Sequence, residues 1–371
     1  MQTPIRPYKD FLFSRHSFAN WRDRPHPLDK PFGGCYGMLV RKIRIHSKKI
    51  SVGGIFMEEL LERLLAECRP WTEQGRVADY IPELGRVADY IPELGKQDPS
   101  ALGVYVTGSD GKRSWAGDWE RPFTLQSVVK PILLLQALLD NGVEAVQRRV
   151  GVEATGKPFD AINAGDQTLD SAHLNPMVNM GAIVMCTLIH GGSYEERFRR
   201  LLELTRRMAG DGSIGINEAV YRSEKAHGSK NRALAYLLKS YGLLEGDAEE
   251  VLDCYFRACS IQVNCRSLAH IGAVFANRGR APVSEERIFP SAFARYVNAI
   301  LVTCGMYDGS GEFAIRVGVP AKSGVSGSIM AAVPTRMGIG IFAPALDRKG
   351  NSVAGIRLLE RLSQELYLSI F

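Results

Sequence analysis

The apolar pattern changes its period along the chain, and this change restricts the fold more than any other feature of the sequence. Residues 102–107 alternate in polarity and lead into Asp110-Gly111, a dipeptide typical of a hairpin turn. Residues 328–333 and 337–343 form a second pair of strand-like segments. The segment between them, roughly residues 170–305, is rich in helical patterns. Strands from both ends with helices between them predict an α+β fold, in which an antiparallel sheet flanked by helices lies beside an all-helical lobe.

Apolar side chains at helical spacing also place individual helices. The first follows residues 57–68 and is stopped by Pro70, and the last covers about residues 352–368. Others are expected at about residues 127–140, 233–240, 248–256, 267–276 and 291–302, each ending near a glycine or a change of pattern.

The positive charge of the chain is concentrated at its N-terminus. The 371 residues carry a formal net charge of +6, but residues 1–56 alone hold eleven Lys or Arg and three Asp, so the remainder is close to neutral. This distribution and the lack of a nucleic-acid-binding motif argue against a nucleic-acid partner. No apolar run is long enough to span a membrane. We expect residues 1–55 to be a disordered basic extension or to lie upstream of a true start at Met57; their Arg content would suit a transit peptide, but their Asp residues oppose that reading.

Residues 56–371 are then expected to form the functional domain, with the helical lobe, about residues 140–305, inserted between the sheet-forming segments.

The seven cysteines are scattered. Those at 254, 259 and 265 cluster, but their spacing fits no zinc pattern. We therefore read the cysteines as small buried apolar residues of a cytoplasmic protein, and expect neither a metal nor an organic cofactor.

A Ser-x-x-Lys motif, Ser127-Val128-Val129-Lys130, is the first candidate for catalysis. On a helix, residues i and i+3 share a face, so the lysine amine can reach the serine hydroxyl. Lysine acts as a base only when neutral, which requires lowering its pKa from about 10.4 to about 7–8. The apolar residues after Lys130 favour such a buried setting. The spacing alone is weak evidence, because Ser109-Asp110-Gly111-Lys112 has it too and is expected to be a hairpin turn.

Two further motifs strengthen the first. Lys322-Ser323-Gly324 precedes the strand at residues 328–333, and in penicillin-recognising serine hydrolases a K-[ST]-G edge strand lies opposite the Ser-x-x-Lys serine. An exposed glycine-rich turn is the alternative. Asn179 follows the turn signal Asn175-Pro176 and opens an apolar helix. It is either a helix N-cap or an amide that points into the cleft.

The chain also contains a tandem repeat. RVADYIPELG occupies residues 76–85 and again residues 86–95. Two copies of ten residues are too few and too short for a stacked repeat architecture, so we read them as a local duplication.

Taken together, these motifs resemble the serine-dependent glutaminase family, whose members have the β-lactamase/transpeptidase-like fold. The similarity covers about residues 57–370 in the order of the family. Its stretches are GRVADYIPEL, FTLQSVVKPI, NPMVNMGAI, YRSEKAHGSKNRALAYLLKSYG, TCGMY, GEFAIRVGVPAKSGVSG and GNSVAGIRLLERL.

The resemblance implies hydrolysis of L-glutamine to glutamate and ammonia through a γ-glutamyl ester on Ser127, with Lys130 as general base. It implies an oxyanion hole of the backbone N–H groups of Ser127 and Val325, and proton transfer to ammonia by Tyr307. It assigns contacts with L-glutamine to Gln126, Asn179, Glu224, Asn231, Tyr255 and Tyr307. From the residues alone, Glu224 and Asn231 read as a solvated helix face and Tyr255 as core. The resemblance also implies a homo-oligomer, a dimer or tetramer.

The chain departs from the family pattern at two places. Met180 stands where alanine usually follows the asparagine, and the VADYIP segment is present twice instead of once. The second copy keeps the usual distance to Ser127, so the site tyrosine is assigned to Tyr90 and not to Tyr80. These departures leave open a catalytically impaired paralogue that serves as a binding or assembly protein. Another serine hydrolase of the same fold is the second alternative.

Overall fold

The computed structural model describes residues 54–75, 91–154, 171 and 174–371. A five-stranded antiparallel sheet has the order β2-β1-β7-β6-β5. Its strands are β1 (Gly103–Gly108), β2 (Arg113–Gly117), β5 (Ala321–Ser323), β6 (Ser328–Val333) and β7 (Met337–Phe342). The hairpins from the two ends of the sequence meet where β1 pairs with β7. A short second ladder joins β3 (Phe123–Thr124) to β4 (Gln262–Val263).

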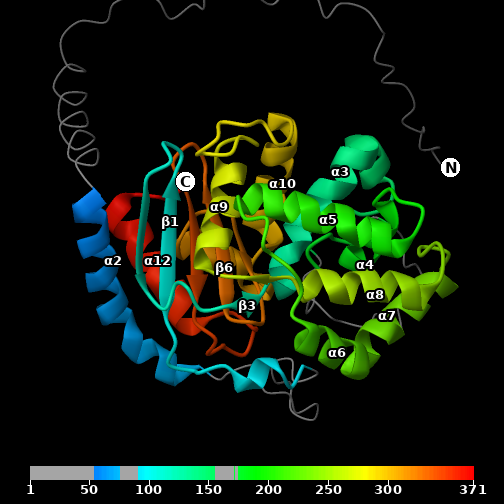
Figure 1. Ribbon diagram of the computed structural model, residues 1–371, viewed down its shortest axis with the longest axis horizontal. Coiled ribbons are helices and arrows are strands. Elements are labelled where there is room, and N and C mark those ends of the chain that lie inside the picture. Colours follow the sequence, from blue (N-terminus) through cyan, green and yellow to red (C-terminus); the bar gives the residue numbers. More distant parts are fainter. Residues whose placement is uncertain (1–53, 76–90, 155–170, 172–173) are drawn as a thin grey trace, which may run out of the picture. The chain divides into compact units, whose positions relative to one another are not determined.

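Helices cover both faces of the sheet. On one face α2 (Gly54–Cys68) and α12 (Val353–Leu366) share an apolar cluster with Ile339 and Ile341 of β7. On the other face α9 (Cys265–Ala276) packs directly on β7 (Figure 1). Gly338 explains this close approach, because a Cβ there would lie 2.0 Å from the backbone N of Ala273. In the alternating GIGIF sequence, the isoleucines give β7 an apolar face. The glycines leave the opposite face without side chains, so that a helix can pack closely on it.

The remaining helices lie mostly beyond α9, on the side of the sheet away from α2 and α12 (Figure 1). Helix α8 packs against α4, α5, α6 and α7, so it is central to this group. The bounds are α3 (Lys130–Gln147), α4 (Asn179–Leu188), α5 (Tyr194–Ala209), α6 (Glu218–His227), α7 (Ser229–Ser240), α8 (Ala248–Cys259), α10 (Ser291–Cys304) and α11 (Ser310–Arg316). Short 3₁₀ turns complete the described elements: η1 (Arg69–Gln74), η3 (Leu94–Lys96), η4 (Gln126–Val129) and η6 (Tyr307–Gly309).

This arrangement confirms the predicted α+β fold class, and most predicted elements agree with it to within a few residues. One helix start is corrected: α3 begins at Lys130, and Ser127 lies in the preceding turn η4. Pro131 occupies the first turn of α3, where a missing N–H costs nothing, and regular helix geometry breaks at Gly142 (φ 77°). Residues 1–53 of the predicted N-terminal extension and the first repeat copy lie outside the described residues, whereas Gly54 and Ile55 already belong to α2. The predicted division into domains stays a prediction.

Candidate active site

Ser127 lies where the sheet side of the molecule meets the helices. The two-residue strand β3 leads into η4, and the backbone N–H of Leu125 donates to the carbonyl of Ile261. Gln126 then adopts a left-handed backbone (φ 47°), which is uncommon for a residue with a side chain and is found disproportionately at functional sites. In a 3₁₀ turn, side chains at i and i+3 eclipse, so Ser127 and Lys130 project from the same side. Both side chains are buried.

The environment of Lys130 suits a neutral amine. Its side chain is fully buried, and Nζ donates to the carbonyl of Met177 at 3.2 Å and to Oδ1 of Asn179 at 2.7 Å. Both of these acceptors are uncharged, and a neutral amine, which has two N–H donors and one lone pair, can satisfy both of them.

Asn179 links Lys130 to the helical group. Its Nδ2 donates to Oδ1 of Asn231 on α7 at 2.9 Å, and the hydroxyl of Tyr255 on α8 lies 3.5 Å from its Oδ1. The N-cap interpretation is wrong: Val178 occupies the cap position of α4, and Asn179 is the first helical residue with its amide turned to Lys130. Five separate elements, η4, α3, α4, α7 and α8, thereby bring together five predicted site residues: Ser127, Lys130, Asn179, Asn231 and Tyr255.

Glu224 is a buried carboxyl group on α6 with 1% of its surface exposed. Its Oε1 has no hydrogen-bond partner within the described part of the chain. Burial raises the pKa of this carboxyl to about 8, and a hydrogen bond from Gln126 opposes the rise. The Gln126 amide also donates to the Thr124 hydroxyl at 3.2 Å. Glu224 is therefore a buried carboxyl group with one oxygen unpartnered within the described residues, and Gln126 joins it to the turn that carries Ser127.

The alternative reading of Glu224 and Asn231 as a solvated helix face is wrong. The helix is interrupted at Gly228, so the two residues belong to different helices, α6 and α7. Both side chains are buried. Gly228 permits this break beside α8, because a Cβ there would lie 2.5 Å from Cζ of Phe256. Lys225, next to Glu224, instead forms an exposed ion pair with Asp253 at 2.6 Å.

The Lys322-Ser323-Gly324 motif lies on the edge strand β5 and continues just beyond it, so the exposed-turn alternative is wrong. Lys322 and Ser323 are fully buried. Beyond the strand, a Cβ on Gly324 would lie 2.9 Å from the carbonyl O of Leu125 and 3.1 Å from Cγ2 of Val128, so this edge is pressed against η4. Lys322 was not among the predicted site residues, although the K-S-G motif was the signal that could have identified it.

Tyr307 and Val325 lie in a small apolar cluster next to this edge. The cluster contains Ile91, Leu94, Val220, Tyr307, Val325 and Leu346, all buried. Ile91 and Leu94 belong to the second repeat copy, so this copy packs against two predicted site residues. Tyr90, the predicted site tyrosine, immediately precedes Ile91 and lies outside the described residues, as does Tyr80.

Met180, which follows Asn179, packs among apolar side chains. It is 5% exposed and belongs to the large apolar cluster that includes Ile132, Ile183 and Phe256. The cysteines at 254, 259 and 265 are likewise free, buried thiols. Among the residues that the structure describes, no group of His, Cys, Asp and Glu side chains has the geometry of a metal site, and no helix is long and apolar enough to cross a membrane.

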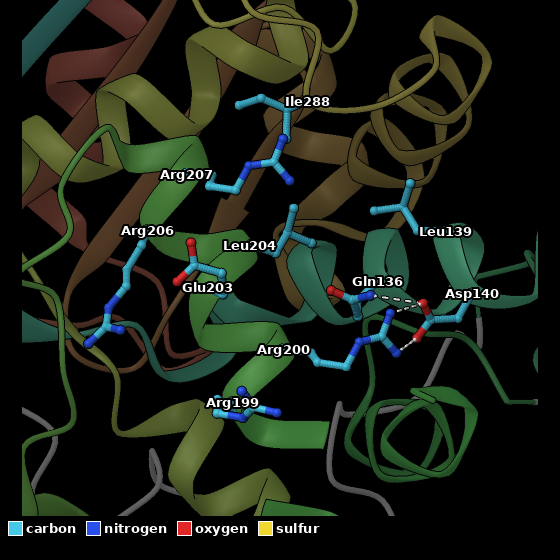
Figure 2. Close-up of a pocket in the computed structure, with 10 residues that line it drawn as sticks. All are labelled: Gln136, Leu139, Asp140, Arg199, Arg200, Glu203, Leu204, Arg206, Arg207 and Ile288. Atoms are coloured by element: carbon cyan, nitrogen blue, oxygen red, sulfur yellow. Dashed lines mark hydrogen bonds and ion pairs between the residues drawn. The ribbon is translucent and has the colours of Figure 1, made fainter. Parts of the chain in front are cut away.

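A separate surface pocket of about 680 Å³ lies between α3 and α5 and includes Ile288 (Figure 2). It contains none of the predicted site residues. Three of its four arginines are ion-paired: Arg199 with Glu196 at 3.5 Å, Arg200 with Asp140 at 2.7 Å and Arg207 with Glu286 at 2.6 Å. The fourth, Arg206, donates to the carbonyl of Ile214. Because these arginines are compensated and the described lining residues include no serine, threonine or cysteine, we do not assign the catalytic site to this pocket.

An antiparallel sheet beside a helical group, with a buried Ser-x-x-Lys turn facing a K-S-G edge strand, defines the class of β-lactamase-like serine hydrolases. Within that class, the glutaminase family model matches residues 85–371. The chain is 49% identical over 315 residues to the glutaminase of Clostridium tetani and to glutaminase 2 of Clostridium perfringens, covering 85% of this chain and 100% of each relative. The chain belongs to the glutaminase family.

Solved structures agree. The crystal structure of the covalent complex between a Bacillus subtilis glutaminase and 5-oxo-L-norleucine, formed by reaction with 6-diazo-5-oxo-L-norleucine, superposes with a TM-score of 0.75 at 37% identity. It covers 85% of this chain and 99% of that chain. A Bacillus glutaminase in the presence of 4.3 M NaCl gives a TM-score of 0.76 at 36% identity over the same shares.

Proposed function

We propose that this protein hydrolyses L-glutamine to L-glutamate and ammonia through a covalent γ-glutamyl ester on Ser127. The observation that carries the proposal is the position of the buried Lys130 amine. This amine donates to two uncharged acceptors, and Lys130 follows Ser127 by one 3₁₀ turn. Membership of the glutaminase family supports the substrate. The covalent complex of the Bacillus subtilis glutaminase with 5-oxo-L-norleucine supports a covalent intermediate.

The proposed chemistry has two halves. Lys130 takes the proton of the Ser127 hydroxyl as its oxygen attacks the side-chain amide carbon, and the backbone N–H groups of Ser127 and Val325 stabilise the oxyanion. The C–N bond then breaks, and ammonia leaves with the proton that Lys130 took from Ser127, relayed through the Tyr307 hydroxyl, so that Lys130 and Tyr307 regain their starting protonation states. In the second half, water adds to the ester carbon and gives its proton to the neutral Lys130. The C–O bond to Ser127 breaks, Lys130 returns this proton to the serine oxygen, and glutamate is released.

Recognition of free glutamine needs three kinds of partner. Glu224 supplies a carboxylate for the α-ammonium, and its buried Oε1 fits that role. Amide and hydroxyl groups of Asn179, Asn231, Tyr255 and Gln126 serve the polar ends of the substrate. Tyr90 of the second repeat copy is proposed to contribute from the neighbouring segment, next to Ile91.

The test is release of ammonia and glutamate from L-glutamine by the purified protein, with L-asparagine as a comparison substrate. Ser127→Ala should lower kcat by at least about 10³-fold, because the nucleophile is lost while binding remains. Ser109→Ala, in the second Ser-x-x-Lys sequence of the chain, is the matched control and should keep full activity. Turnover that survives Ser127→Ala would contradict the assignment.

Two outcomes would favour the alternatives. A folded protein that binds glutamine without turnover would indicate the impaired paralogue, and a variant lacking residues 76–85 would show whether the duplication is the cause. Acylation by a penicillin-type reagent, without glutamine turnover, would indicate another serine hydrolase. A cytoplasmic homo-oligomer, dimer or tetramer, is also proposed, and light scattering measures its size.

A further inference from the structure

The loop between β7 and α12, residues 343–352, lies against the turn that carries Tyr307. Its Asn351 is 1% exposed, and the side-chain Nδ2 donates to the carbonyl of Met306 at 3.3 Å. Gly350 of the same loop borders the tyrosine itself, because a Cβ on this glycine would lie 3.6 Å from Cε2 of the ring. The loop therefore contacts a residue proposed for proton transfer, although no role has been assigned to any of its own residues.

The backbone of Tyr307 needs support from its surroundings. Its φ of 53° lies in the left-handed region, which residues with a side chain seldom adopt and which persists only where other contacts hold it. Ser310 of α11 is one such contact, because its Oγ donates to the carbonyl of Tyr307 at 2.8 Å and accepts from the backbone N–H of Met306 at 3.0 Å. Asn351 is a second contact, on the carbonyl of Met306. Two buried side chains from separate segments thus fasten this turn.

The loop that supplies Asn351 is fixed by its own hydrogen bonds. Oδ1 of Asp347 accepts the backbone N–H groups of Lys349 at 2.8 Å and Asn351 at 2.9 Å. The backbone N–H of Asp347 donates in turn to the carbonyl of Asn351 at 2.8 Å. Gly350 completes the turn with a φ of 87°, a conformation that glycine adopts without strain. Lys349 also pairs with Glu312 of α11 at 3.5 Å, so the loop presents Asn351 from a backbone that is already held in place.

We propose that Asn351 is a positioning residue for proton transfer: it holds the left-handed turn of Tyr307 so that the tyrosine hydroxyl reaches the departing ammonia. The inference rests on the proposed function, because it concerns the leaving group of that reaction. In the relay, Tyr307 gives its hydroxyl proton to the amide nitrogen as it receives the proton held by Lys130. Asn351 touches no reacting atom and acts through Tyr307. Its loss should therefore slow the departure of ammonia more than any other step.

The test compares kcat/KM for two substrates with different leaving groups, L-glutamine and L-glutamate γ-methyl ester, in Asn351→Ala. An amide nitrogen cannot leave without a proton, whereas an ester oxygen needs less help. The value for glutamine should therefore fall about tenfold and that for the ester by less than about threefold. Asn298→Ala on α10 is the matched control. Its Nδ2 also donates to a backbone carbonyl, that of Phe275 at 3.2 Å, and its Oδ1, like that of Asn351, is buried without a partner among the described residues. This variant should leave the ratio of the two values unchanged.

The ratio of the two kcat/KM values does not depend on how much of the enzyme is folded, so a loss of stability alone does not change it. Ser310→Ala loosens the same turn from α11 and should lower the ratio in the same direction, which decides the question if Asn351→Ala fails to fold. Equal losses with both substrates would overturn the inference and leave Asn351 a packing residue. Absence of glutamine turnover in the wild type would refute the proposed function instead.

Discussion

Two segments of this chain have the same Ser-x-x-Lys spacing and different environments. In the turn at residues 109–112, the Lys112 side chain is 68% exposed, and its Nζ lies 3.2 Å from a carboxylate oxygen of Asp110. The Ser109 hydroxyl donates to the carbonyl of Thr335. In the second segment, Ser127 and Lys130 are buried in the molecule, and the lysine amine donates to the Asn179 amide oxygen and to the Met177 carbonyl.

The difference shows what turns a lysine into a base. Water and a carboxylate, the surroundings of the Lys112 amine, both stabilise an ammonium group. Lys130 is buried, and the two acceptors described for its amine, the Met177 carbonyl and the Asn179 amide, are uncharged. The spacing is the same in both segments, but burial and these acceptors differ, and both differences favour a neutral amine at Lys130.

The largest effect should come from replacing the two lysines in parallel. Lys130→Met removes the proposed base and should lower kcat by roughly 10²- to 10⁴-fold, because general-base catalysis contributes that much. Lys112→Met removes an exposed ion pair and should leave kcat unchanged. Steady-state kinetics with L-glutamine measures both. If the two variants lose activity equally, the contrast between the two segments has no catalytic meaning.

A smaller and more selective change gives Lys130 the kind of partner that Lys112 has. Asn179→Asp places a carboxylate where the amide oxygen lies 2.7 Å from Nζ. The carboxylate favours the protonated amine, so the rising limb of kcat/KM should move up by about 1–3 pH units, with partial recovery at high pH. Asp110→Asn makes the reverse change in the exposed turn and should have no effect. A loss of activity that is the same at every pH would show that Asn179 does not act through Lys130.

The sequence predicted those parts of the fold that depend on local patterns. Alternation at residues 102–107 predicted strand β1, and the strand-like segment at residues 328–333 predicted β6. The Asp110-Gly111 dipeptide predicted the hairpin between β1 and β2. The edge position of Lys322 followed from the K-S-G motif. These features depend on backbone preferences that neighbouring residues set.

Burial of charged groups was not predictable in the same way. Glu224 and Asn231 are seven residues apart, which on one helix would indicate a shared face, but a break at Gly228 assigns them to two helices. What covers a helix face depends on contacts with distant segments, and period alone carries no information about them. For the same reason the contact between Lys322 and Tyr307 became apparent only in the structure.

The smallest expected effect tests whether burial, which is as complete at Lys322 as at Lys130, also changes the ionisation of a carboxyl group. Burial raises the pKa of Glu224 to about 8 in the folded protein, above the usual value of an exposed glutamate. Between pH 5.5 and 7.5 the unfolded chain therefore binds fewer protons than the folded one, and the free energy of unfolding should fall as pH rises. Glu224→Gln removes this dependence.

The stability of Glu224→Gln relative to the wild type should thus increase by about 1.4 kcal/mol per pH unit across that range. Urea unfolding at pH 5.5, 6.5 and 7.5 measures the difference, and Glu73→Gln on the exposed turn η1 is the matched control. A difference that does not change with pH would mean that Glu224 is ionised in the folded protein without its substrate. The contrast between exposed and buried ionisable groups would then hold for the lysines alone, because desolvation would have failed to neutralise a carboxylate that is as deeply buried as Lys130.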